Sequence, residues 1–104
     1  MHTIALVHAS RAAVDPVTQH FNEAAPELKT VNLLDDGVMT SLAKLDIERA
    51  VRRLSEMVES AWLEYGASAV LVTCSAVSRD GMRALRANAK IPIIRLKNAG
   101  PKAR

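Results

Sequence analysis

The residues best suited to chemistry lie around the single cysteine of the chain. Cys74 follows the apolar run 69–72 and stands between two hydroxyl residues, Thr73 and Ser75. Such a run predicts a strand buried on both faces, and the small polar residues after it predict a loop that leads to a helix N-terminus. Free backbone N–H groups there favour a thiolate, which can act as a base or a nucleophile. We therefore predict Cys74 as a catalytic residue; the alternative is a small core residue, which is common for free cysteines.

A second polar loop follows the first apolar run, 3–7, and carries His8 and Ser10. In an open parallel sheet, ligands bind beyond the carboxyl ends of the strands, where the strand order reverses. If the strands at 3–7 and 69–72 are neighbours at that point, their exit loops share one crevice. The crevice would then offer a histidine, hydroxyl groups and the thiol: His8, Ser10, Thr73, Ser75 and Cys74.

The rest of the chain predicts alternating helices and strands. Asp15 and Pro16 signal a helix start as the N-cap and the first helical residue. Asp46 is the predicted N-cap of the longest helix, which Gly66 ends. The segment 38–44 is compatible with a short helix or with an irregular lid. The predicted helices cover 15–25, 46–65 and 78–88, and the predicted strands cover 3–7, 31–34, 69–72 and 91–94.

This alternation predicts the fold class. Strands that alternate with helices form a parallel sheet with right-handed crossovers. We expect a three-layer α/β domain with a four-stranded, mostly parallel sheet in the flavodoxin-like order 2-1-3-4. Residues 1–96 are assigned to this single domain, and residues 97–104 to a basic, polar C-terminal tail.

The composition suits one globular domain, with 49% hydrophobic and 24% charged residues. No apolar stretch approaches the roughly 20 residues of a membrane span. The first residues lack the basic segment of a secretory signal. One cysteine forms no intramolecular disulfide, and three scattered histidines offer no zinc site. We expect a cytoplasmic protein without a metal and without a membrane partner.

Charge is distributed unevenly along the chain. Residues 1–78 contain six Lys or Arg against ten Asp or Glu, whereas residues 79–104 contain eight against one. Four of the basic residues recur at helical spacing: Arg79, Arg83, Arg86 and Lys90. Only 3% of the residues are aromatic, so a solvated basic helix face is favoured over a nucleic-acid interface.

Three stretches resemble the first lobe of the aspartate/glutamate racemase superfamily, which includes hydantoin racemases, maleate isomerases and arylmalonate decarboxylases. They are IALVHAS at 4–10, VNLLD at 31–35 and, most specifically, ASAVLVTCS at 67–75. The resemblance extends to Leu96. It implies a racemase-type lobe and a cofactor-independent enzyme that acts at the α-carbon of a small carboxylate. The active site of these enzymes lies between two similar lobes.

The resemblance also implies roles for individual residues. Cys74 would be the acid/base of the first lobe, Ser75 and Ala76 would hold the substrate carboxylate, and Ser10 would belong to the first substrate loop. The sequence departs from the racemase pattern at Ser75-Ala76, where many members have Asn-Thr. Because this sequence has one lobe and one cysteine, two-base chemistry requires a second lobe. We expect a homodimer that uses the helix after the first strand, the segment 38–45 and Trp62.

Two other classes of function stay open at this point. A non-catalytic binding or assembly module would keep the fold and a buried Cys74. A basic nucleic-acid-associated protein would show salt-dependent affinity for DNA or RNA. No motif in the sequence identifies the substrate.

Overall fold

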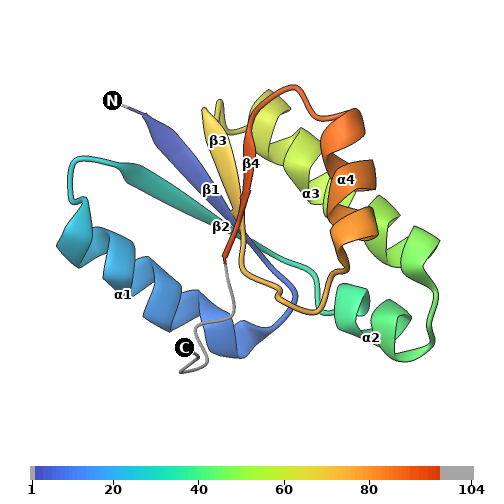
Figure 1. The fold of residues 1–104 in the computed structure, drawn as a ribbon. Coiled ribbons are helices and arrows are strands. Elements are labelled where there is room, and N and C mark those ends of the chain that lie inside the picture. The colour runs from blue at the N-terminus through green and yellow to red at the C-terminus, as the bar shows by residue number, and fades with distance from the viewer. Residues whose placement is uncertain (1, 97–104) are drawn as a thin grey trace.

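Four parallel strands form the centre of the molecule, as a computed structural model that describes residues 2–96 shows (Figure 1). The order in the sheet is β2-β1-β3-β4 and every pairing is parallel, which confirms the predicted fold class and topology. The C-terminal tail predicted at 97–104 lies outside the described residues. The strands are β1 (Thr3–His8), β2 (Lys29–Leu34), β3 (Ala69–Val72) and β4 (Ile93–Arg95).

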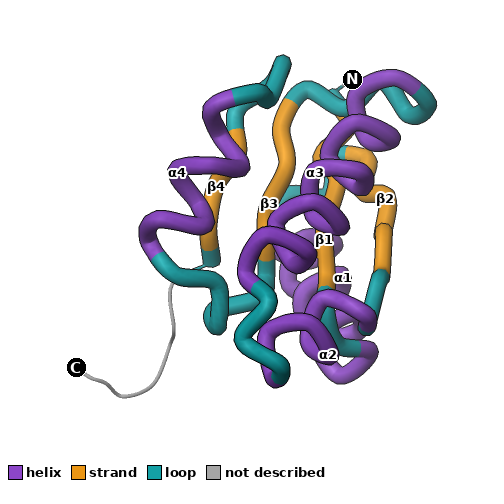
Figure 2. Tube along the Cα trace, turned by 90° about the vertical axis from the view of Figure 1, so that its right-hand side faces the viewer, coloured by secondary structure: helices purple, strands orange, loops and turns teal. Residues whose placement is uncertain are grey.

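The helices cover the two faces of the sheet unequally (Figures 1 and 2). On one face, α1 (Val14–Ala24) packs against β1 and β2. On the other face lie α3 (Ile47–Leu63) and α4 (Arg79–Ala87), and the short α2 (Gly37–Ala43) packs on α3. Because α1 stops short of β4, the Ile94 side chain on that strand is 55% exposed.

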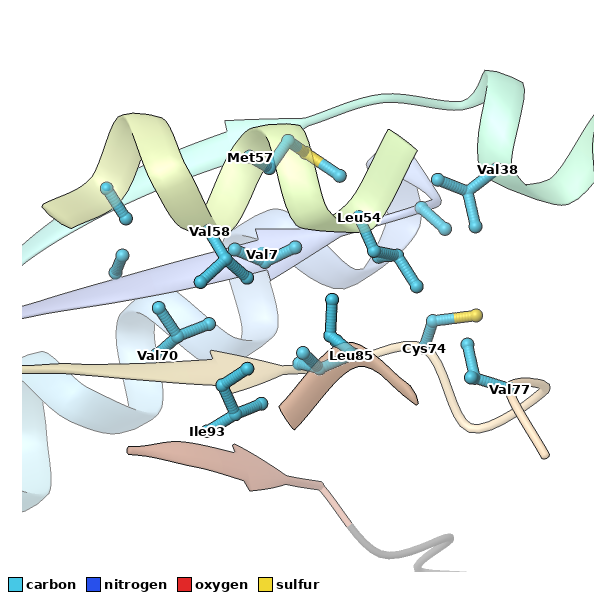
Figure 3. Close-up of a cluster of buried hydrophobic side chains, with 14 of the residues drawn as sticks. Val7, Val38, Leu54, Met57, Val58, Val70, Cys74, Val77, Leu85 and Ile93 are labelled. Carbon is cyan, nitrogen blue, oxygen red and sulfur yellow. The ribbon is translucent and has the colours of Figure 1, made fainter. Parts of the chain in front are cut away.

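The main core lies between the sheet and α3 (Figure 3). Alternate residues of the central strands, such as Val7 and Val70, point to this face, where Leu54 and Val58 of α3 meet them. The helix presents these residues at a spacing of four, the period of a buried helical stripe. A 17-residue helix is about 25 Å long, whereas a strand of four to six residues spans about 13–20 Å. Ile47, the first residue of α3, and Tyr65, just after its end, are therefore exposed.

Several element boundaries differ from the sequence prediction. The predicted N-cap Asp15 instead lies in the first turn of α1, which begins at Val14. A single 3-10 turn, Arg11–Ala13, precedes the helix, and the Ser10 hydroxyl caps this turn by accepting the Ala12 N–H. Pro16 fits the first turn because its missing N–H would have no helical partner there. The undecided segment 38–44 is the helix α2, and β4 begins at Ile93 rather than at 91.

The predicted N-cap of α3 is confirmed, whereas the helix ends at the C-cap Glu64, two residues before the predicted Gly66. The Asp46 side chain accepts the Arg49 N–H at 3.1 Å and so caps α3. Gly66 follows α3 with a φ of 63°, a left-handed conformation that glycine adopts without steric cost. The Ser78 hydroxyl accepts the Gly81 N–H at 3.0 Å and caps α4. These caps fix where the loop after β3 ends.

Candidate functional site

A pocket of about 190 Å³ lies at the carboxyl edge of the sheet, between the loops that follow β1 and β3. The two loops meet because β1 and β3 are neighbours, with Val7 paired to Val72. The volume is below the roughly 300–1,000 Å³ of sites for drug-sized ligands, so the pocket suits a small molecule. Five of its lining residues are predicted site residues: Ser10, Thr73, Cys74, Ser75 and Ala76.

Cys74 forms part of the pocket wall and is only 9% exposed. Figure 3 shows it just beyond the end of β3, at the end of the core cluster and near Val77. Its Sγ lies 3.8 Å from Sδ of Met39, a residue of α2 that also lines the pocket. A molecule that reaches the thiol must therefore pass beside the Met39 side chain.

His8 is fully buried and does not line the pocket. Its Nε2 lies 2.7 Å from Asn32 Oδ1, and its Nδ1 lies 2.9 Å from Thr73 Oγ1. Asn32 Oδ1 also accepts the Thr18 hydroxyl at 3.2 Å. Because an amide oxygen only accepts, the contact with Asn32 assigns the imidazole proton to Nε2. The single proton of the Thr73 hydroxyl then has two acceptors within reach, His8 Nδ1 at 2.9 Å and the Val7 carbonyl at 3.3 Å. Of the predicted site residues, His8 is the one the structure separates from the others, and it reaches the pocket only through Thr73.

The loop between Cys74 and Ser78 offers backbone donors. Within residues 2–96, the N–H groups of residues 75–77 form no hydrogen bond. Arg95 at the end of β4 donates from Nη2 to the Ser75 carbonyl at 2.7 Å. The C=O of Ser75 and the N–H of Ala76 belong to one trans peptide and point in opposite directions. Arg95 therefore orients the Ala76 N–H away from its own guanidinium, and this loop next to a helix N-terminus can bind an anion.

A salt bridge holds α2 beside the pocket. Arg53 of α3 donates from Nε and Nη2 to the two carboxylate oxygens of Asp35, at 2.8 and 2.9 Å. Asp35 Oδ1 also accepts the Gly37 N–H at 2.9 Å, where α2 begins. The hydrogen bond from Arg53 lowers the pKa of Asp35 below its usual value. Asp35 thus links β2, α2 and α3, and it fixes the helix that carries Met39.

Sequence reasoning missed two residues at this site, Met39 and Arg95. Arg95 directly follows the strand predicted at 91–94, so the rule that strand ends share one edge of a parallel sheet could have found it. No sequence signal marked Met39, because its position depends on how α2 packs on α3.

Comparison with known proteins leaves the family open: no family model matches the sequence, and no curated protein matches it. Residues 2–96 contain no group of three His, Cys, Asp or Glu side chains placed to bind a metal ion. None of the described helices combines the length and the hydropathy needed to cross a membrane. The chain is thus a small α/β domain with a four-stranded parallel sheet of order 2-1-3-4, and no family is identified.

Proposed function

We propose that this protein is a cofactor-independent, racemase- or isomerase-like lobe that moves a proton at the α-carbon of a small carboxylate. Cys74 is the acid/base, and a second copy of the chain supplies the second lobe. The observation that supports this proposal is the 190 Å³ pocket, where loops more than sixty residues apart in sequence bring Ser10, Cys74 and Ser75 together. This grouping is the one that the resemblance to the aspartate/glutamate racemase superfamily implies.

The pocket has donors for the carboxylate of the substrate. The Ser10 hydroxyl oxygen accepts the Ala12 N–H, which leaves its proton free to donate. Ser75 and Ala76 line the pocket, and their N–H groups, which form no hydrogen bond within residues 2–96, are further donors to a carboxylate or to the enolate that forms from it. The Thr73 hydroxyl is hydrogen-bonded to His8, so Thr73 forms part of the pocket wall and does not donate to the substrate.

The reaction uses one thiolate and one thiol. The Cys74 thiolate of one copy takes the α-proton: the C–H bond breaks, an S–H bond forms, and the electron pair stays on the carbanion. The Cys74 thiol of the second copy then returns a proton to the opposite face, so its S–H bond breaks as the new C–H bond forms. The second copy is required because the chain has only one cysteine.

A second candidate function is a non-catalytic binding or assembly module. The burial of Cys74 favours it, because a thiol that is 9% exposed and in contact with Met39 also behaves as an ordinary core residue. The two functions differ in whether the thiol exchanges protons with a bound carboxylate.

The test is α-proton exchange in deuterated water, followed by NMR and by optical rotation. The full chain is incubated with aspartate, glutamate and hydantoins. We expect exchange to be abolished in Cys74→Ala and weakened about tenfold or more in Ser10→Ala. The matched control is Ser60→Ala on α3, because Ser60 does not line the pocket. This variant should leave the rate of α-proton exchange unchanged.

Two outcomes would reject the proposal. Exchange that persists in Cys74→Ala would assign the activity to another site or to a contaminant. Complete absence of exchange in a confirmed dimer, over the same panel and with arylmalonate decarboxylation also absent, would favour the non-catalytic module.

A further inference from the structure

A second cavity, of about 470 Å³, lies between α2 and the N-terminal end of α3. It shares no lining residue with the Cys74 pocket. We propose that this cavity binds a phosphate group, either as free phosphate or as part of a small phosphorylated molecule. The proposal is independent of the proposed function, because it uses none of the residues assigned to proton transfer.

Three cationic side chains line the cavity, Lys44, Arg49 and Arg53, against one carboxylate, Asp46. Arg53 uses Nε and Nη2 for Asp35, so its Nη1 keeps both protons for another acceptor. Arg49 approaches Asp46 only through Nε, at 3.4 Å. Its two terminal nitrogens can therefore donate to an anion in the cavity. Among the residues that line the cavity, cations outnumber carboxylates by three to one, which favours an anion there. Asp35, Asp36 and Glu56 also act on Arg53, but they do not line the cavity.

A buried hydroxyl at this cavity has no partner in the protein. Ser41 lines the cavity and is only 4% exposed, yet its side chain makes no hydrogen bond to another residue within 2–96. The other two buried polar side chains, His8 and Thr73, are hydrogen-bonded to each other. A buried hydroxyl without a partner is unfavourable. An oxygen of a bound anion would accept the proton of the Ser41 hydroxyl and so supply the missing partner.

The donor set fits a tetrahedral oxyanion better than a single planar carboxylate. Guanidinium groups, an ammonium group and the hydroxyls of Thr40 and Ser41 come from two helices and the loop between them. Four phosphate oxygens can use donors from several directions, and arginine binds phosphate with two N–H groups at once. The positive end of the 17-residue helix α3 adds to the potential. The cavity has no aromatic wall for a base to stack on, which distinguishes it from single-stranded nucleic-acid sites.

The test is titration of the full chain with inorganic phosphate, followed by amide NMR shifts, with sodium chloride of equal ionic strength as the reference. We expect saturable shifts confined to residues 37–53. Lys44→Gln and Arg49→Gln should each weaken binding about tenfold, because each removes a charge-assisted hydrogen bond. Ser41→Ala should weaken it several-fold, with an unchanged circular dichroism spectrum as the check on folding.

The matched control is Arg83→Gln on α4, which removes an arginine that is exposed like Arg49 and also has an i,i+3 aspartate partner, Asp80. Phosphate affinity should not change in this variant or in Cys74→Ala. If Arg83→Gln lowers the phosphate affinity as much as Arg49→Gln does, the attraction is diffuse and electrostatic, and the proposal is overturned. Shifts that do not saturate, or that chloride reproduces, would overturn it as well. Glycerol phosphate, titrated in parallel, shows whether a phosphate ester binds more tightly than the free ion.

Discussion

At the scale of single residues, the environment of Cys74 determines how its chemistry can be reached. The thiol faces a pocket, but Met39 of α2 lies against it at a sulfur–sulfur distance of 3.8 Å. Met39 itself is 42% exposed, so it stands between solvent and the thiol. A methionine is unbranched and flexible, and it can move aside more readily than a branched residue.

We predict that Met39→Ala raises the rate at which Cys74 reacts with iodoacetamide, because the substitution removes the side chain that shields the thiol. An increase of about tenfold is expected if shielding limits the reaction in the native protein. The measurement is the second-order rate at fixed pH and ionic strength. Leu45→Ala, at an exposed position just after α2, is the control and should react like the native chain. Equal rates in all three proteins would show that Met39 does not control access.

His8 has a structural role that its position near Cys74 did not indicate. We predict that His8→Phe lowers the free energy of unfolding by about 1–3 kcal/mol, because it leaves Asn32 and Thr73 without the partner they have in the native sheet. Urea unfolding at pH 7 measures this change. His20→Phe, at an exposed site on α1, should change it by less than about 0.5 kcal/mol. A loss in His8→Phe as small as this would contradict the role.

At the scale of elements, the Asp35–Arg53 salt bridge determines where α2 lies. The bridge is half-buried, and Asp35 also holds the first N–H of α2. A Cβ at Gly37 would overlap the Arg53 guanidinium, so a larger residue there would displace this side chain from Asp35. The position of α2 in turn places Met39 at the Cys74 pocket and Ser41 at the second cavity.

We predict a pH-dependent contribution of this bridge to stability. The pKa of Asp35 is below its usual value of 3.8 in the folded protein, mainly because Arg53 donates to it. A carboxyl group with a lowered folded pKa stabilises the fold above its unfolded pKa, and the contribution is lost as the pH falls through the folded value. The native chain should therefore exceed Asp35→Asn by about 1 kcal/mol in free energy of unfolding at pH 7. This difference should close below pH 3.8.

Urea unfolding between pH 7 and pH 2.5 tests this expectation. Asp36→Asn is the matched control, because it removes a neighbouring carboxylate that forms no salt bridge within residues 2–96. The free energy of unfolding of Asp36→Asn should differ little from that of the native chain at every pH in this range. A constant difference between the native chain and Asp35→Asn over the whole range would show that the ionised bridge is not its source.

At the scale of the whole molecule, the sheet is covered by α1 on only part of one face. Ile94 and Leu96 are 55% and 39% exposed, and the Leu96 N–H bonds to the Val72 carbonyl at the end of β3. This apolar edge therefore lies beside the loop that carries Cys74. A second copy that covers it would approach the pocket, as the proposed two-lobe site requires.

We predict a homodimer that survives dilution to micromolar concentration, with an interface of about 1,600 Å² in total. Ile94→Lys should weaken dimerisation about tenfold or more, because it places a charge on the apolar edge. Leu63→Lys, at a similarly exposed leucine beside Trp62, tests instead the interface that was expected from the sequence. Sedimentation velocity over a concentration series measures the dimerisation of the native chain and of both variants. A native chain that is monomeric at every concentration, or equal effects of the two variants, would contradict this interface.

The sequence was enough to predict the topology of the sheet and the kind and order of its helices and strands, except for α2, whose segment was undecided. The buried strand before Cys74 and the cap at Asp46 are local features, and local chemistry was enough to predict them. The strand order followed because alternating strands and helices permit few sheet topologies. The shared crevice of Ser10 and Cys74 followed from that order.

Which side chains face the pocket depends on tertiary contacts. His8 is the last residue of β1 and its side chain turns inward to Asn32 and Thr73, whereas Ser10 lies beyond the end of the strand and reaches the pocket. Met39 and Ser41 depend on the position of α2, which a salt bridge across 18 residues of sequence fixes. Such contacts join residues distant in sequence, so no local pattern encodes them, whereas elements with local periods and caps can be predicted directly.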